Sequence, residues 1–287
     1  MDRHAHVPVA LTIAGSDSGG GAGIQADLKT FHQWGVFGTS VLTAVTAQNT
    51  LGVQKVHAVP AAVVEAQVQS VATDLAPLAF KSGMLANTAV VRAVAASIRR
   101  HGLTRYVLDP VMVATSGDTL LEPDAVTAMR DQLVPLAALV TPNWPEAVLL
   151  TGVSEPGLRG MDMAARAIID AGAGAVLVKG GHLPGDEVVD LYRDGRSRRV
   201  FRQPRMETRH THGTGCALSA AIAAGLAQDA SIPDAVAAGV AWVRAAIAGA
   251  PGLGAGNGPL NHFAPVPSNI GISASSNTPR VPPASSP

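Results

Sequence analysis

Short apolar runs alternate with alanine-rich helical patterns along most of this chain of 287 residues. The first apolar run spans 9–14, and a glycine-rich segment and a helical pattern from about Ile24 follow it. Such alternation is the signature of βαβ units, and therefore of a mostly parallel sheet covered by helices. The pattern predicts further strands at 39–45, 78–81, 106–108, 139–140 and 175–178.

A polar or glycine-rich cluster follows nearly every one of these predicted strands. In an open α/β sheet, ligands bind in the crevice outside the carboxyl ends of the strands. Because parallel strands all end at one edge, we expect these clusters to meet in a single binding site. The clusters span 15–23, 46–50, 82–84, 109–112, 141–146 and 179–182.

Two regions depart from this pattern. The segments 188–192 and 199–203 flank Asp194 and Gly195, which predicts a hairpin added to the parallel sheet. From 264 to 287 the chain is rich in Ser, Pro and Asn and has little periodicity, which predicts a disordered tail. We therefore expect one α/β domain over 1–263, followed by this tail.

The charge balance argues against nucleic acid or a membrane as a partner. Lys plus Arg equals Asp plus Glu, at 21 each, and aromatic residues make up only 3%. The single cysteine excludes an internal disulfide and leaves a structural zinc site without ligands. The N-terminus has no signal-peptide pattern, and no apolar run has transmembrane length. We expect a soluble, cytoplasmic protein.

The segment 211–225 carries the strongest local signal for chemistry. Gly213, Thr214 and Gly215 precede an Ala/Leu-rich run, so a glycine-rich turn leads directly into a predicted helix. The first backbone N–H groups of a helix have no partners within it and favour an anion such as phosphate. Cys216 would lie in the first turn, where the helix dipole favours the thiolate over the ordinary pKa of about 8.5. A simple tight turn and a small buried cysteine are the alternatives.

Two other phosphate-binding motifs are excluded. The sequence has no Gly-x4-Gly-Lys-Ser/Thr motif, which excludes a P-loop. The glycines after the first strand do not meet Gly-x-Gly-x-x-Gly, and no acidic residue ends the second strand, which excludes a Rossmann dinucleotide site.

Six segments together carry a resemblance to a known family. In order and spacing, from about Ala10 to His262, the chain resembles the hydroxymethylpyrimidine/phosphomethylpyrimidine kinases of thiamine biosynthesis. The resemblance implies an α/β, ribokinase-like three-layer sandwich with a mostly parallel central sheet, flanking helices and a small lid. It also implies phosphorylation of 4-amino-5-hydroxymethyl-2-methylpyrimidine, then of its monophosphate, with ATP and Mg²⁺, by a homodimer. The segments are 15–27, 46–50, 81–85, 141–143, 178–182 and 211–216.

At the phosphate end, the resemblance assigns catalytic roles that these residue types support. The backbone N–H groups of Gly213, Thr214, Gly215 and Cys216 would hold the charge that builds on the transferring phosphoryl group. Cys216 would also take the proton of the acceptor hydroxyl. Lys179 would contact the triphosphate, and a solvated lysine at a strand end is the alternative. Lys179, Gly213 and Gly215 would therefore also bind ATP.

The same resemblance places the metal and the rest of the nucleotide. Asp109 and Glu146 would bind Mg²⁺ through water, because Mg²⁺ gives up its hydration reluctantly. Asn143 and Thr211 would complete the ATP site. Asp109, Asn143 and Glu146 also occupy positions where helix-cap and turn residues are common, so that interpretation stays open.

At the acceptor end, Gln48 is expected to recognise the aminopyrimidine edge. A Gln side chain pairs at once with an amine donor and a ring-nitrogen acceptor, as it does with adenine. Met84 would form an apolar wall for the ring, or would be a core residue. Asp17 and Asp27 are expected near the substrate, and Asp27 supporting the first turn of its helix is the alternative. Gly15, Ala22 and Val111 complete the expected substrate-binding set.

Two alternative functions remain open. The first is a pyridoxal kinase of the same fold, because pyridoxine shares the hydroxymethyl group and lacks the ring amine. Gln48 and Cys216 favour the pyrimidine. The second is a non-catalytic nucleotide-binding protein, against which the intact glycine turn, Cys216 and Lys179 argue.

Overall fold

Most of the strands join in one sheet. The computed structural model describes residues 7–112 and 123–268. The strands of the main sheet are β1 (Val9–Ala14), β2 (Phe37–Leu42), β5 (Ala79–Ser82), β6 (Tyr106–Leu108), β7 (Leu139–Val140), β8 (Ala175–Val178), β9 (Glu187–Asp194) and β10 (Arg198–Pro204). Within the described residues, the sheet has eight strands in the order β10-β9-β8-β7-β6-β5-β1-β2. Neighbours from β2 to β8 are parallel, as expected.

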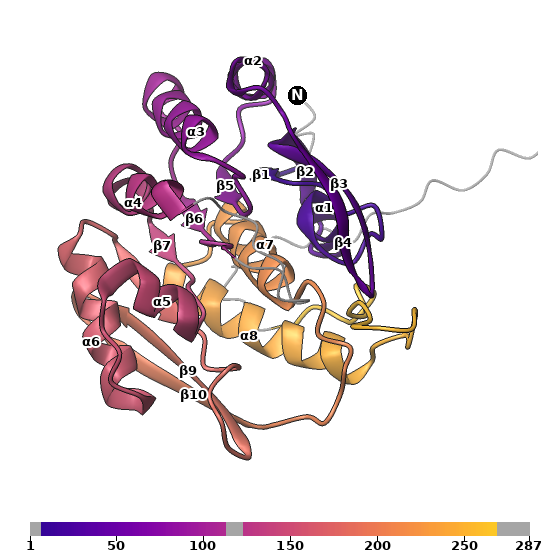
Figure 1. Cartoon of the computed structure of the whole chain (residues 1–287), viewed down its shortest axis with the longest axis vertical. Helices are drawn as coiled ribbons and strands as arrows, with labels where there is room; N and C mark the ends of the chain where they lie inside the picture. Colours follow the sequence, from indigo (N-terminus) through magenta and orange to yellow (C-terminus); the bar gives the residue numbers. More distant parts are fainter. Residues whose placement is uncertain (1–6, 113–122, 269–287) are drawn as a thin grey trace, which may run out of the picture.

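Helices cover both faces of this sheet and make a three-layer sandwich (Figure 1). One apolar core lies under the helices α1 (Gly23–Gln33), α7 (Thr214–Ala227) and α8 (Ile232–Ala248). The other lies under α2 (Ala61–Asp74), α3 (Thr88–His101), α4 (Pro123–Gln132), α5 (Trp144–Thr151) and α6 (Gly157–Asp170), with the short 3-10 helix η1 (Val134–Leu136). The predicted sandwich is therefore confirmed.

The central position of β1 and α7 explains their composition. Every residue of β1 is buried, as in a parallel strand covered on both faces, which is why its sequence is apolar except for Thr12. From Ala217 onward, every residue of α7 is buried as well. The predicted apolar face with Leu218 and Ile222 is inside, but the opposite face is inside too. Alanine dominates α7 because it lies between α1, α8 and the sheet.

The prediction for the second strand, 39–45 followed by a loop, is wrong. The chain leaves the sheet at Thr43, whose N–H donates to the carbonyl of Ala14 and whose carbonyl accepts from the N–H of Val59. It continues as β3 (Ala44–Asn49), which pairs with β4 (Gly52–Ala58) in an antiparallel, two-stranded sheet. This small sheet corresponds to the expected lid, and it carries Gln48 on a strand rather than in a loop after one.

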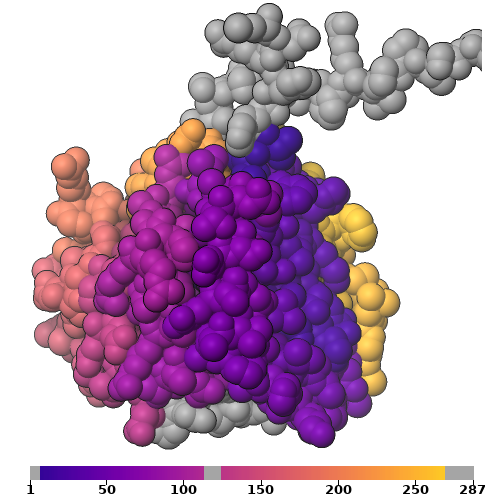
Figure 2. Space-filling view, turned by 90° about the horizontal axis from the view of Figure 1, so that it is seen from above, coloured from indigo at the N-terminus to yellow at the C-terminus, as the bar shows by residue number. Residues whose placement is uncertain are grey.

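The appended hairpin is confirmed as β9–β10, which adds two antiparallel strands at the β8 edge. Figure 2 shows the N-terminal half of the chain as a continuous surface, with the yellow segment after residue 250 at its edge. In the described part of the chain, no helix is long and apolar enough to cross a membrane.

The predicted tail begins too early at 264. Ala264 is only 3% exposed, and its carbonyl accepts hydrogen bonds from Trp242 Nε1 at 2.9 Å and Gln33 Nε2 at 3.0 Å. Val266 packs against the same core. The chain is therefore docked beyond Phe263, and residues 269–287 lie outside the described residues.

Candidate active site

A cavity of about 890 Å³ opens at the carboxyl edge of the sheet. Because the parallel strands end there, it collects segments that are far apart in the sequence, as expected for an open α/β sheet. Of the sixteen residues predicted for the site, all except Asp27 line the cavity. These are Gly15, Asp17, Ala22, Gln48, Met84, Asp109, Val111, Asn143, Glu146, Lys179, Thr211, Gly213, Thr214, Gly215 and Cys216.

The glycine turn before α7 forms an anion nest. Gly213 is the N-cap, with a φ of 80°, and a Cβ there would overlap the carbonyl oxygen of Gly21. The N–H and hydroxyl of Thr214 both donate to the carbonyl of Thr211, at 3.2 and 2.6 Å. Among the described residues, the N–H groups of Gly213, Gly215 and Cys216 have no such partner. The nest therefore offers three free donors rather than the four predicted.

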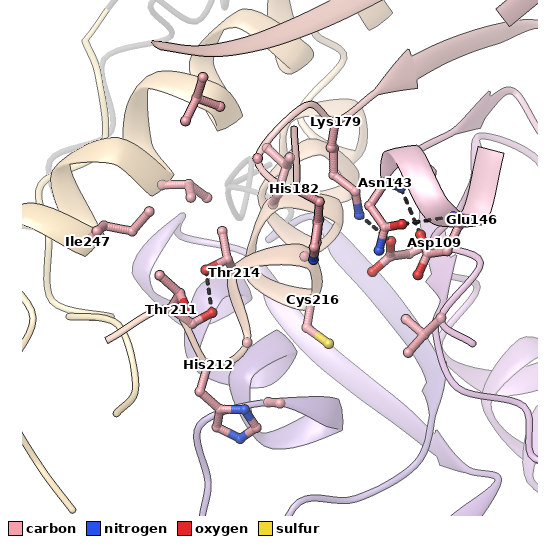
Figure 3. Close-up of a pocket in the computed structure, with 18 of the residues that line it drawn as sticks. Asp109, Asn143, Glu146, Lys179, His182, Thr211, His212, Thr214, Cys216 and Ile247 are labelled. Carbon is pink, nitrogen blue, oxygen red and sulfur yellow. Dashed lines mark hydrogen bonds and ion pairs between the residues drawn. The ribbon is translucent and has the colours of Figure 1, made fainter. Parts of the chain in front are cut away.

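Cys216 lies in the first turn of α7, half-buried, and points toward the centre of the cavity (Figure 3). Burial raises the pKa of the Cys216 thiol to about 12. Lys81 and the N–H of Gly23 act in the opposite direction, whereas Asp27 and Asp109 raise the pKa further. The predicted preference for the thiolate is therefore wrong, because burial disfavours the charged form of Cys216.

Lys179 follows β8 and forms an ion pair with Asp109, which follows β6. Lys179 Nζ lies 2.9 Å from Asp109 Oδ1, and the lysine side chain is 15% exposed toward the cavity. Burial works to raise the pKa of Asp109, but Lys179, Lys81 and Thr141 lower it overall. Burial likewise works to lower the pKa of Lys179, but the neighbouring carboxylates raise it. Both groups are therefore charged, and Lys179 is not a solvated lysine.

Asn143 and Glu146 form the capping box of α5. Asn143 Oδ1 accepts the Glu146 N–H at 2.9 Å, and Glu146 Oε2 accepts the Asn143 N–H at 2.8 Å. The helix-cap interpretation of both residues is thus confirmed, although both also line the cavity. Burial raises the pKa of Glu146 to about 7, against the opposing effect of Lys179.

Among the residues predicted to bind the acceptor, Gly15 and Met84 are in close contact. A Cβ at Gly15 would lie 2.7 Å from Met84 Sδ, so only glycine leaves room for the methionine. Gln48 Oε1 accepts a hydrogen bond from Thr46 Oγ1 at 3.2 Å, which orients the Gln48 amide. Ala22 and Val111 also line the cavity. Met84 is both a buried side chain and a cavity wall.

Asp17 lines the cavity and organises the loop after β1, because both of its carboxylate oxygens accept hydrogen bonds from this region. Its Oδ1 accepts the N–H of Gly19, and its Oδ2 accepts the N–H groups of Gly21 and Ala22. His212 Nε2 contacts the same Oδ2 at 2.8 Å. Burial works to raise the pKa of Asp17, but these hydrogen bonds lower it overall. The carboxylate therefore ties the loop after β1 to the segment before the nest.

Asp27 lies behind the cavity wall in a fully buried ion pair. Its Oδ2 lies 3.1 Å from Lys81 Nζ and accepts the hydroxyl of Thr12 at 2.6 Å, and both charged side chains are 0% exposed. Burial works to lower the pKa of Lys81, but Asp27, Cys216 and Asp109 raise it overall. The predicted contact of Asp27 with substrate is not seen in the cavity lining, and Asp27 does not cap its helix.

Several lining residues were not predicted. His212, which follows Thr211, is one, and its partner Asp17 is 195 residues away in the sequence. His182 is another; burial, Lys179 and Arg205 lower the pKa of His182. The apolar end of the cavity is built from α7 and α8, and Figure 3 shows Ile247 across the nest from Asp109 and Glu146. In the sequence, such residues are indistinguishable from the core face of a helix. The apolar lining from these helices is Leu218, Val240, Val243 and Ile247.

Comparison with known proteins decides the family. A family model described as phosphomethylpyrimidine kinase matches residues 17–261. The chain belongs to this family. The hydroxymethylpyrimidine/phosphomethylpyrimidine kinase of Rhizobium meliloti is 55% identical over 258 residues, which cover 89% of this chain and 97% of the relative. The enzyme of that name from Bacillus subtilis is 46% identical over 256 residues, covering 89% and 94%.

Solved structures agree on a kinase of the ribokinase-like fold. A Bacillus subtilis pyridoxal kinase in an ADP complex has a TM-score of 0.84 at 37% identity, covering 90% of this chain and 98% of that one. A phosphomethylpyrimidine kinase from Clostridium difficile has a TM-score of 0.75 at 38% identity, covering 83% and 98%. The predicted family, fold and kinase activity are thus confirmed.

Proposed function

We infer that this kinase phosphorylates 4-amino-5-hydroxymethyl-2-methylpyrimidine and then its monophosphate, using ATP, in thiamine biosynthesis. The observation that carries this inference is one cavity whose lining includes the glycine turn before α7, Gln48 with Met84, and apolar side chains of α7 and α8. Gln48 and Met84 suit a small aminopyrimidine, and their part of the lining is assigned here to the acceptor. The apolar side chains of α7 and α8 suit an adenine ring.

At the nest, the free N–H groups of Gly213, Gly215 and Cys216 would hold the charge on the transferring phosphoryl group. Preorganised donors of this kind are typically worth about 3 kcal/mol each at a transition state. Lys179 has access to the cavity, so it can contact the triphosphate while Thr141 and Ser219 still hold Asp109. Asn143 and Thr211 complete the ATP site.

Asp109 and Glu146 are the groups we assign to Mg²⁺. Their carboxylate oxygens are the hard donors that Mg²⁺ prefers. Among the described residues, no group of three or more His, Cys, Asp or Glu side chains could enclose a metal ion, which fits an ion that keeps most of its waters. When bound, the ion would neutralise charge on the triphosphate.

Cys216 is the group we assign to the hydroxyl proton, because it lies between the nest and the acceptor end. In the first reaction the nucleophile is an alcohol, and a positioned base is typically worth about 10²–10⁴-fold. In the second reaction the nucleophile is a phosphate oxygen with a pKa of about 6, which is already ionised at neutral pH. Only the first reaction therefore needs a base.

We also propose a compartment and an oligomeric state. The protein is a cytoplasmic homodimer, since family resemblance implies the dimer and an ATP-consuming biosynthetic step needs a compartment rich in ATP.

Pyridoxal kinase activity is the second candidate function, and the likeness to the Bacillus subtilis pyridoxal kinase favours it.

The test is an acceptor assay with Mg-ATP, in which ADP release is followed with the pyrimidine alcohol, its monophosphate, pyridoxal and no acceptor. Turnover of both pyrimidines supports the proposal, and turnover of pyridoxal alone would replace it with the second candidate.

Cys216→Ala should slow the alcohol reaction by at least about a hundredfold and the monophosphate reaction far less. An equal loss in both would assign Cys216 to the nest instead of the proton.

A further inference from the structure

One side-chain contact joins the loop after β1 to the segment before α7, at the wall of the cavity. Asp17 lies in the loop after β1, and His212 directly precedes Gly213, the N-cap of α7. His212 Nε2 lies 2.8 Å from Asp17 Oδ2, and the two side chains are 9% and 1% exposed. Both residues line the cavity, although 195 positions separate them in the sequence. No step of the proposed reaction uses this contact.

On one side of the contact, the loop after β1 is tied to the strand that carries Gln48. Thr46 Oγ1 donates to the carbonyl of Ser16 at 2.8 Å. Ser18 Oγ donates to the carbonyl of Gln48 at 2.9 Å and accepts the N–H of Gln48 at 2.8 Å. The loop and β3 therefore form one hydrogen-bonded unit, called the acceptor unit below, which carries Gln48 and the loop residues assigned to the acceptor.

On the other side, the same loop packs directly against the nest. A Cβ at Gly213 would overlap the carbonyl oxygen of Gly21, and a Cβ at Gly21 would lie 2.6 Å from His212 Cδ2. The φ of Gly21 lies outside the left-handed region, so the contact requires a missing side chain there and not a special backbone. The imidazole of His212 therefore reaches Asp17 only because residue 21 is glycine.

The hydrogen bond has a defined direction. Asp17 Oδ2 also accepts the N–H groups of Gly21 and Ala22, at 3.0 and 2.8 Å, so it is an acceptor and His212 Nε2 carries the donated proton. The same oxygen thus fixes the shape of the loop and the position of His212.

We propose that His212 is a positioning residue, whose hydrogen bond to Asp17 holds the acceptor unit at the distance from the nest that phosphoryl transfer requires. This inference rests on the proposed function. The acceptor hydroxyl is held by the acceptor unit, and the γ-phosphate is held by the nest, so the contact between the two sets the approach of oxygen to phosphorus. A misplacement of about 1 Å can cost about 10²-fold in rate.

The experiment compares His212→Ala with His212→Gln, because the Gln amide keeps an N–H donor for Asp17. With Mg-ATP and the pyrimidine alcohol, phosphorylated product and inorganic phosphate are measured in the same reaction. In His212→Ala, kcat for the alcohol should fall by about a hundredfold, while the KM for ATP changes little. The ratio of inorganic phosphate to product should rise by about tenfold or more, because water attacks the γ-phosphorus without being held by the acceptor unit. His212→Gln should retain most of the wild-type rate and ratio.

The ratio distinguishes positioning from damage to the fold. Loss of folded enzyme, or of the nest itself, lowers transfer and hydrolysis together and leaves their ratio unchanged. An unchanged ratio in His212→Ala, or a Gln variant no better than the Ala variant, would overturn the proposal. His57→Ala, at an exposed position of β4, is the matched control and should keep the wild-type rate and ratio.

Gly21→Ala tests the same contact from the loop side. Its Cβ would push the imidazole away from Asp17, so this variant should lower kcat and raise the ratio as His212→Ala does. Added to His212→Ala, it should have little further effect, because two changes that act through one contact are not additive. Additive losses would overturn the proposal. Gly195→Ala is the matched control, because a Cβ there meets no atom of the described residues within 4 Å.

Failure of this inference is separable from failure of the proposed function. If the wild-type enzyme phosphorylates the pyrimidine alcohol and His212→Ala keeps its kcat, only the role of His212 is rejected. If the wild-type enzyme phosphorylates pyridoxal alone, the proposed function is rejected, and the same variants are compared with pyridoxal. Where His212→Ala does not fold, Gly21→Ala decides, since it must raise the ratio.

Discussion

Two lysine–aspartate pairs lie in or near the candidate site, and they differ mainly in burial. Lys81 and Asp27 meet at 3.1 Å with both side chains 0% exposed, and neither lines the cavity. Lys179 and Asp109 meet at 2.9 Å with the lysine 15% exposed, and both line the cavity. Each lysine stands at or just after the carboxyl end of a parallel strand, β5 or β8.

A lysine–aspartate ion pair can serve two different purposes, depending on its access to the cavity. A sealed pair cannot exchange its partner for water, so its charges act as a fixed local field, and loss of one partner leaves the other unpaired. A pair with access to a cavity can exchange its partner for a phosphate oxygen. We therefore expect the Lys81 pair to matter most for stability and the Lys179 pair most for phosphoryl transfer.

The largest expected effect is on stability. Lys81→Met should lower the free energy of unfolding by about 3–5 kcal/mol, because Asp27 is then buried without a counter-ion. Lys179→Met should cost about 1 kcal/mol, because Asp109 lines the cavity and keeps its contacts with Thr141 and Ser219. Urea unfolding measures both, with Lys55→Met as the control. Equal losses for the two variants would remove the distinction between the pairs.

For catalysis, the Lys179 pair should matter more, although its loss costs less stability than loss of the Lys81 pair. Lys179→Met should reduce kcat/KM by about 10²–10³-fold for the alcohol and for the monophosphate alike, since both reactions transfer the same phosphoryl group from ATP. Initial rates with each acceptor measure this. A loss confined to one acceptor would show that Lys179 belongs to the acceptor end.

A smaller effect should appear at the acceptor end alone. Gln48→Leu should lower kcat/KM for the pyrimidine alcohol by about 1–3 kcal/mol and leave the KM for ATP unchanged, because the ring amine and nitrogen lose their partner. Any turnover of pyridoxine should suffer much less. Gln54→Leu, on the neighbouring strand β4, is the matched control. Equal losses for both acceptors would make Gln48 structural.

The pH dependence of the KM for Mg-ATP should show whether Glu146 takes part in Mg-ATP binding. Glu146, whose pKa is about 7, gains a proton as the pH falls below that value and then no longer attracts Mg²⁺. We expect the KM for Mg-ATP to rise by up to about tenfold for each pH unit below 7, and Glu146→Gln to abolish this trend. Steady-state kinetics between about pH 5.5 and 8 test it. A variant that keeps the wild-type profile would assign the titration to another group.

The smallest effect is expected from the C-terminus. Truncation after Ser268 should leave the rates of both reactions and the melting temperature unchanged, because the Ser- and Pro-rich segment beyond it has little apolar surface to bury. A cut after Phe263 should instead cost about 1–3 kcal/mol, because it removes the carbonyl of Ala264 that accepts from buried Trp242. Thermal melts of both truncations, beside the full chain, decide between these boundaries.

Local patterns were sufficient for much of the fold. The strands at Val9–Ala14, Tyr106–Leu108, Leu139–Val140 and Ala175–Val178 lie where apolar runs predict them, because fully buried parallel strands need continuous apolar sequence. The prediction of the second strand was wrong because the sequence 39–49 contains no turn or breaker signal that shows where the chain leaves the sheet, at Thr43. That departure depends on hydrogen bonds to Ala14 and Val59.

By itself, the sequence determined the layered fold and the glycine turn before α7, which depend on period, glycine geometry and the rule that parallel strands end at one edge. Together with the family resemblance, it also named sixteen site residues, of which fifteen line the cavity. Only the tertiary structure decided the charge states and the pairings. Asp27 meets Lys81 across 54 residues, and Asp17 meets His212 across 195. The thiol form of Cys216 is favoured because burial, which depends on residues from several elements, raises its pKa.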